Sequence, residues 1–169
     1  MNNNPGADTV YRMMDSKVEA SDAIDEVLAC AKNEIRIFDS TPAALRERDF
    51  GRPARIDRLR QLLIANRQHR LRIVLQETRG IESELPRLLN LLALLSAQIQ
   101  IHRCTASARD ARDVMIIADD AHFWRKPYFE HPRSILTLRD PTATQPFVDR
   151  FEEIWLNSDP AFSGGTAGL

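Results

Sequence analysis

Segments of helical and of strand periodicity alternate along residues 21–102, and this alternation constrains the fold more than any other feature of the sequence. Apolar residues recur every three or four positions in three segments and every second position in three others. The expected helices cover 21–33, 53–66 and 82–97, and the expected strands cover 34–39, 69–76 and 98–102. Helices between successive strands favour a mainly parallel sheet covered on both faces.

The second half of the chain predicts a different arrangement. Val114 to Ala118 is an uninterrupted apolar run, as expected for a strand that is buried on both faces. Asp119 and Asp120 follow as a turn, and 122–125 reads as the strand that returns from it. A further strand at 134–138 and a helix that begins near Thr144 complete the pattern. Adjacent strands without a helix between them predict an antiparallel portion.

The length and the tails suggest a single domain. A chain of 169 residues with 43% hydrophobic residues has enough apolar material for one core. We expect a domain over 11–162, with disordered tails at 1–10 and 163–169. The connection 40–52 contains Pro42 and several charges, and it reads either as a functional loop or as a short helix through 43–45.

Four segments together resemble one half of a phospholipase D-like protein. Three are the strand 34–39 before a long loop, the helix 59–67 that leads into the strand 71–75, and 147–155, which resembles the family's closing helix. The fourth, 115–119, is similar to the second half of the family's central motif of histidine, any residue, lysine, four mostly apolar residues and aspartate. The resemblance implies an α/β fold with a phospholipase D-like mixed sheet, mostly parallel with an antiparallel hairpin near the C-terminus, and helices on both faces.

The catalytic residues of that motif are missing. With Asp119 in the aspartate position, Arg112 stands in place of the histidine and Val114 in place of the lysine. If Asp120 is taken as the aspartate of the motif, Asp113 stands in place of the histidine and Met115 in place of the lysine. Arginine remains protonated and has no lone pair with which to attack phosphorus. We therefore expect no catalytic residues and no ordinary phosphodiesterase activity.

Five residues around this motif are candidate ligand-binding residues. They are Arg112, Asp119, His122, Arg125 and Lys126. Arginine binds phosphate or carboxylate with two parallel hydrogen bonds. Alternatively, the basic residues form a solvated charged face, residues 119–120 form only a turn, and His122 has a structural role.

No cofactor, metal or membrane span is expected. The two cysteines, Cys30 and Cys104, have no ligand spacing with histidine, so a zinc site is not indicated. The richest apolar run, 88–95, is interrupted by Asn90 and is too short to cross a bilayer, and the N-terminus lacks a secretion signal. We expect a cytoplasmic protein, and the net charge of −1 shows no general preference for polyanions.

The expected function is a non-catalytic phospholipase D-like module. Its ligand would be an anionic or phosphate-bearing molecule, nucleic acid or a protein partner. Since a single copy of this unit typically pairs with another, the resemblance also implies a homodimer or a separate partner domain. The alternative is a phosphodiesterase with rearranged active-site residues that uses His122 or Asp119. A response-regulator-like domain fits less well, because Asp119 and Asp120 follow a different strand from the one expected in such a domain.

Overall fold

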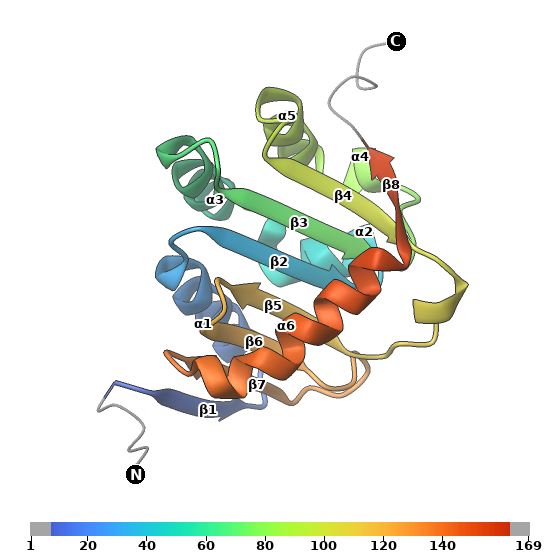
Figure 1. The fold of residues 1–169 in the computed structure, drawn as a ribbon. Coiled ribbons are helices and arrows are strands. Elements are labelled where there is room, and N and C mark those ends of the chain that lie inside the picture. Colours follow the sequence, from blue (N-terminus) through green and yellow to red (C-terminus); the bar gives the residue numbers. More distant parts are fainter. Residues whose placement is uncertain (1–7, 163–169) are drawn as a thin grey trace.

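The computed structural model describes residues 8–162 and shows one mixed sheet with helices on both faces (Figure 1). Its strands are β1 Val10–Met14, β2 Glu34–Asp39, β3 Arg70–Leu75, β4 Ile99–Cys104, β5 Val114–Ala118, β6 His122–Lys126, β7 Ser134–Leu138 and β8 Ser158–Phe162. Its α-helices are α1 Lys17–Cys30, α2 Pro42–Leu45, α3 Pro53–Ala65, α4 Ile81–Glu84, α5 Pro86–Leu94 and α6 Pro141–Leu156. The π-helical turn η1 Arg46–Phe50 and the 3-10 turn η2 Ala106–Ala108 are short connections.

The expected α/β class with a mixed sheet between helices is confirmed, but the sheet is less parallel than expected. The strand order is β1-β7-β6-β5-β2-β3-β4-β8. Only β2–β3 and β3–β4 pair in parallel among the described strands, whereas five pairings are antiparallel. The expectation of a mostly parallel sheet is therefore corrected. The reason is that β5 returns along the free side of β2 in the opposite direction, and the later strands add beside it.

Neither of the two edge strands, β1 and β8, was predicted from the sequence. β1 pairs with β7, and Val10, expected in a disordered tail, is already part of it. β8 pairs with β4 although it contains Pro160, a residue that sheets tolerate mainly on edge strands. The remaining residues of the two expected tails, 1–7 and 163–169, lie outside the part of the chain that the structure describes.

Two helices differ from their expected bounds. α1 begins after Ser16, whose Oγ accepts a hydrogen bond from the Glu19 amide at 3.2 Å, whereas the helix was expected to begin at residue 21. The single helix expected over 82–97 is two helices separated at Leu85. Pro86 explains the break, because it lacks an amide hydrogen and restricts the residue before it.

The two faces of the sheet carry different helices, and this decides where the side chains of β6 point. α1, α3 and α5 cover one face, and α6 crosses the other (Figure 1). Trp124 packs in the core under α1, whereas Phe123 packs in the core under α6. Since side chains alternate along a strand, Lys126 shares the face of Trp124, and Arg125 lies on the face of Phe123.

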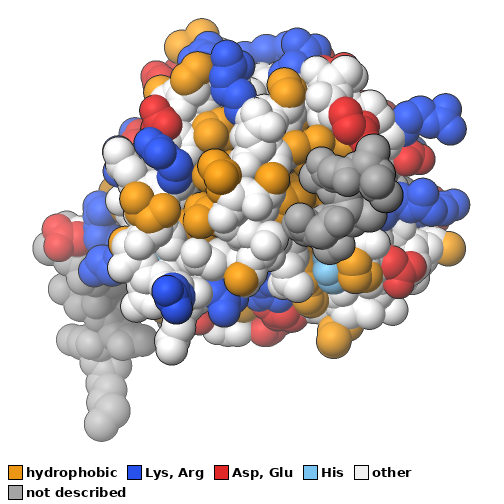
Figure 2. Space-filling view, turned by 90° about the horizontal axis from the view of Figure 1, so that it is seen from above, with side chains coloured by type: hydrophobic (Ala, Val, Ile, Leu, Met, Phe, Trp, Pro, Cys, Tyr) orange, Lys and Arg blue, Asp and Glu red, His pale blue; other side chains and the backbone are white. Residues whose placement is uncertain are grey.

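Hydrophobic side chains gather on the side of the molecule that carries α3 and α5 (Figure 1, Figure 2). Figure 2 shows hydrophobic side chains gathered in the middle of this side of the molecule, with most of the charged side chains around them. Leu94 on α5 and Ile64 on α3 are among the large hydrophobic residues that remain exposed.

Within residues 8–162, no helix has both the length and the hydropathy needed to cross a bilayer.

Candidate anion-binding site

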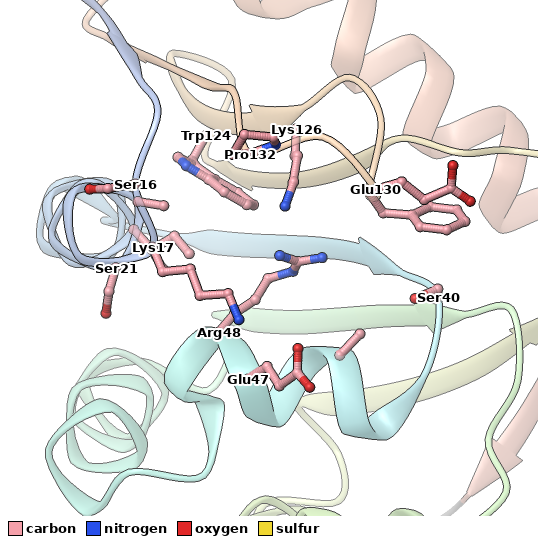
Figure 3. A pocket seen from close by; sticks show the side chains of 14 residues that line it. Ser16, Lys17, Ser21, Ser40, Glu47, Arg48, Trp124, Lys126, Glu130 and Pro132 are labelled. Carbon is pink, nitrogen blue, oxygen red and sulfur yellow. The ribbon is translucent and has the colours of Figure 1, made fainter.

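A cavity of about 420 Å³ opens at the end of the sheet where β2 and β6 finish (Figure 3). Its walls come from the start of α1, from α2 and η1, and from the segment after β6. Ligands of α/β proteins commonly bind beyond the carboxyl ends of strands, where loops and helix starts meet. The lining residues are Ser16, Lys17, Ala20, Ser21, Ile24, Ser40, Ala44, Glu47, Arg48, Trp124, Lys126, Phe129, Glu130 and Pro132.

Three cationic side chains project into this cavity from three separate elements. Lys17 belongs to α1, Arg48 to η1 and Lys126 to β6 (Figure 3). Among the described residues, neither lysine forms an ion pair within 4.0 Å, whereas Arg48 pairs with Asp39. Burial lowers the pKa of Lys126, and the positive charges of Arg48 and Lys17 lower it further. The lysine is thus held among like charges, as expected of a site that accepts an anion.

Buried contacts hold Arg48 in place. Its Nε donates to Oδ2 of Asp39 at 2.7 Å, and the Asp39 side chain is 0% exposed. The Arg48 carbonyl accepts a hydrogen bond from the buried guanidinium of Arg55, and the Arg48 guanidinium lies 5.5 Å from the centre of the Trp124 ring. Ser21 donates to Asp49 at 2.6 Å and fastens η1 to α1. The connection 40–52 is therefore an ordered wall of the cavity.

Lys126 lies beside the position at which the family's lysine is missing. In the antiparallel β5–β6 pair, Val114 and Lys126 are direct partners. Side chains that lie directly opposite each other share one face of a sheet. The amino group that Val114 cannot supply is thus present on the neighbouring strand, on the same face and beside the cavity.

The first residue of α1 adds an unfavourable charge to the same place. Lys17 is the first helical residue after the Ser16 cap, where the helix dipole favours anions and disfavours cations. The acidic Glu19 lies in the same turn, so the conflict is confined to Lys17 itself. Such conflicts between local preference and observed sequence concentrate at functional sites.

The acidic residues of the cavity do not neutralise these cations. Glu47 and Glu130 both line it and both are solvent-exposed. Glu130 accepts a hydrogen bond from Arg112 at 3.0 Å outside the cavity. Glu47 acts on Lys126 more weakly than the neighbouring cations do. Arg48 is paired with the buried Asp39, so the positive charge without an ion pair among the described residues belongs to Lys17 and Lys126.

The structure separates the five candidate residues of the sequence analysis instead of bringing them together. Lys126 alone lines the cavity described above, and Arg112 reaches only its rim through its contacts with Phe129 and Glu130. Asp119 and His122 lie at the other end of β5, which is four steps of about 3.3 Å, or about 13 Å, away.

Asp119 has a structural task at that end. Its carboxylate accepts hydrogen bonds from the amides of Lys32, Asn33 and Glu34 at 2.8–3.1 Å, so it binds the backbone at the start of β2. Its φ of 52° is the left-handed turn conformation that aspartate tolerates. The turn expected at 119–120 is confirmed.

His122 also contacts the backbone. Its Nδ1 accepts a hydrogen bond from the Arg139 amide at 3.0 Å, and burial is the main cause that lowers its pKa. It lines a separate cavity with Cys30, Lys32 and Arg139. Each of the other three histidines likewise has a ring nitrogen in a hydrogen bond, to Leu62, Ser158 and the Arg133 amide. No histidine lines the cavity of Lys126.

Arg125 projects from the opposite face of the sheet. Its guanidinium lies 4.6 Å from the centre of the Phe147 ring, within a cavity of about 490 Å³ that Arg112 and Arg150 also line. Burial is the main cause that lowers the pKa of Arg125. Arg125 and Lys126 are therefore neighbours in sequence that serve different cavities.

Two of the three cations were missed by the sequence analysis. Arg48 had an indirect signal, because a charged connection of this length is often functional. Lys17 had only its unfavourable place at the start of a helix, and that start was expected near Ser21. Among the described residues, no cluster of three histidine, cysteine or carboxylate side chains suits a metal ion.

Comparisons with known proteins agree with this architecture. The sequence profile of the family described as "Domain of unknown function (DUF7931)" matches residues 16–163. No curated protein matches the chain. The match covers most of the chain and therefore shows that the chain belongs to this family.

Solved structures show the fold. A phospholipase D family member, Nuc from Salmonella typhimurium, is 15% identical with a TM-score of 0.58, over 92% of this chain and 100% of that one. NucT from Helicobacter pylori is 11% identical with a TM-score of 0.55, over 90% and 99%. TrmBL2, an archaeal chromatin protein described as binding DNA, is 16% identical with a TM-score of 0.59, over 94% of this chain and 56% of that one. The fold is therefore phospholipase D-like.

Proposed function

Because the chain belongs to the DUF7931 family and has a phospholipase D-like fold, we propose that it is a non-catalytic module that binds a phosphate-bearing ligand. The binding site is the cavity of Lys17, Arg48 and Lys126, which we call the phosphate cavity. One observation carries the proposal: two lysines without an ion-pair partner among the described residues face the same cavity as a half-buried arginine. A phosphate dianion would supply the missing negative charge.

The absence of a histidine beside these cations within residues 8–162 supports binding without turnover. The residues that line the phosphate cavity include serines and carboxylates but no imidazole. Neither Ser16, Ser21 nor Ser40 has a histidine partner, and Ser21 already donates to Asp49. Activation of a serine needs an adjacent base. We expect no release of nitrophenolate from bis(4-nitrophenyl) phosphate.

The rival function, a phosphodiesterase with rearranged residues, has weaker support. It needs His122 or Asp119 near the cations, yet both lie at the far end of β5 and bind backbone groups there. Turnover of the same substrate that disappears in His122→Ala would favour the rival and contradict the proposed function.

Removal of the Lys126 charge is expected to weaken phosphate binding about tenfold or more. A hydrogen bond to a charged group contributes about 1.5–3 kcal/mol, and about 1.4 kcal/mol corresponds to a tenfold change in affinity. The measurement is a titration of the ¹⁵N-labelled protein with inorganic phosphate, for the wild type and for Lys126→Met.

The matched control is Lys32→Met. Lys32 is an exposed lysine outside the phosphate cavity, so its removal changes the net charge equally. We expect this variant to bind phosphate within about twofold of the wild type, since distant exposed charges are screened by salt. Equal losses in the two variants would show that only net charge matters and would refute the site.

Phosphate binding should also weaken at alkaline pH. The loss should occur at a lower pH than it would with a lysine of ordinary pKa. Burial and neighbouring cations lower the pKa of Lys126, so this side chain loses its charge below the usual lysine pKa of about 10.4. Affinity is then retained at neutral pH and lost as the pH rises through the lowered pKa. The Lys126→Arg variant keeps its positive charge and should bind phosphate up to a higher pH than the wild type. Coincident pH profiles of the two proteins would show that the loss of affinity does not come from Lys126.

Other expectations from the sequence stay predictions. Nucleic acid remains one possible carrier of the phosphate, and TrmBL2, a structure of the same fold, is described as binding DNA. Pairing with a second copy of the chain is expected from the single unit, and light scattering measures it. The cytoplasmic location likewise stays an expectation.

A further inference from the structure

The second cavity described above lies on the other face of the sheet and contains a charge without a partner. Arg125 extends from β6 under α6, and its Nε–H is buried with no hydrogen-bond partner among the described residues. The nearest acidic influence on it is Asp113. That carboxylate is already held by Arg150, through contacts of 2.9 Å to Nε and 2.6 Å to NH2. The guanidinium of Arg125 therefore lacks a counter-ion within residues 8–162.

The Phe147 ring compensates only part of this. A cation beside an aromatic face gains less than a guanidinium loses when it leaves water without a carboxylate. The Arg125 side chain is half-buried, and its Nε–H is buried without a partner in the described part of the chain, which is unusual in a stable fold and marks a candidate functional site. An external anion that enters the cavity would complete the missing pair.

The chemistry of the walls indicates what kind of anion fits. Arg112 is engaged with Glu130 and Arg150 with Asp113, which leaves Arg125 as the cation of the cavity without an ion pair among the described residues. Asp110 also lines the cavity, but its side chain is solvent-exposed and forms no ion pair with Arg125 within 4.0 Å. A single guanidinium matches a single carboxylate, which it binds with two parallel hydrogen bonds. Pro127, Tyr128 and Phe147 supply apolar and aromatic surface beside it, and the Tyr128 side chain is 64% exposed.

We propose that the cavity formed by Arg125, Pro127, Tyr128 and Phe147 binds a carboxylate that is attached to an aromatic or apolar group. This carboxylate site is independent of the phosphate cavity, because the two open on opposite faces of the sheet and share no lining residue. The carboxylate pairs with Arg125, and the attached group packs on Tyr128 and Phe147.

The test uses benzoate as the probe and benzamide as its uncharged counterpart. In a titration of the ¹⁵N-labelled full chain, benzoate is expected to shift the Nε–H signal of Arg125 and the amide of Tyr128, whereas benzamide leaves both unchanged. Equal responses to the two compounds would overturn the proposal, because they would show apolar contact without charge recognition.

Variants locate the site. Arg125→Met should weaken benzoate binding at least tenfold, and Arg125→Lys should restore it only in part, since lysine lacks the two-pronged geometry. Because Arg125 lies inside the sheet, Tyr128→Ala provides a second variant on an exposed side chain, for which we expect a loss of about threefold or more. Unchanged binding in a folded Arg125→Met protein, or in Tyr128→Ala, would refute the site.

Lys126→Met separates this inference from the proposed function. The variant should lose phosphate binding and retain benzoate binding, while Arg125→Met should show the reverse. If benzoate instead competes with phosphate and fails in Lys126→Met, the carboxylate site is wrong and the phosphate cavity stands alone. Loss of phosphate binding in Arg125→Met would likewise contradict the independence of the two sites.

Discussion

Replacing Arg48 with methionine is expected to lower the free energy of unfolding by about 3 kcal/mol or more. The change leaves the carboxylate of Asp39, which is fully buried, with only the backbone amide and hydroxyl of Ser40 as partners. Removal of one member of a buried ion pair typically costs about 3–5 kcal/mol, because the other charge stays desolvated. The melting temperature of a domain of this size should fall by about 6–12 °C.

The double variant Arg48→Met/Asp39→Asn provides the control. Asparagine can keep an acceptor for the Ser40 amide and removes the buried charge, so we expect most of the lost stability to return. Urea unfolding of the two single variants and the double variant measures the coupling between the residues. A single variant as stable as the wild type would show that Asp39 is neutralised in another way.

The same double variant also tests the phosphate cavity without a folding defect. It remains folded but lacks the guanidinium that faces Lys17 and Lys126. We therefore expect stability near that of the wild type together with clearly weaker phosphate binding. Restored stability with unchanged binding would assign Arg48 a purely structural role.

Replacing Phe151 with alanine is expected to lower the free energy of unfolding by about 3–5 kcal/mol. Its ring is fully buried between α6 and the sheet, in the core cluster that includes Phe38, Met115 and Ile117. Truncation of such a ring removes its transfer free energy and leaves a cavity that the neighbours fill only in part. Chemical unfolding followed by circular dichroism measures the loss.

Leu156→Ala is the matched control on the same helix. This side chain is 83% exposed, and we expect a change within about 0.5 kcal/mol. A comparable loss in both variants would mean that the helix responds to propensity and not to packing. A loss in Phe151→Ala alone would show that α6 is held to the sheet by its buried face.

Much of the fold could be read from local pattern. β2 and β5 have the bounds that their apolar residues predicted, because strands buried on both faces need continuous or closely spaced apolar side chains. Pro53 begins α3 as expected of a residue suited to a first helical turn. Pro86 indicates the break between α4 and α5, whereas the leucine-rich pattern around it predicts one continuous helix.

The edge strands could not be read in this way. Val10–Met14 exposes its three central residues, and Ser158–Phe162 is half-exposed and contains a proline. Neither segment has the alternation of a half-buried strand. They are strands because β7 and β4 offer them unpaired backbone groups, which is a property of the assembled sheet.

The sequence by itself determined the class of the fold, since apolar periodicity depends on residue type and short spacing. Only the tertiary structure decided the site. Lys126 and Arg125 are adjacent in sequence, yet the alternation of side chains along β6 sends them to different cavities. Lys17 and Arg48 join Lys126 because the order and direction of the strands bring the start of α1, the end of β2 and the end of β6 to one end of the sheet. Such proximity between distant segments arises from strand pairing and leaves no trace in local sequence.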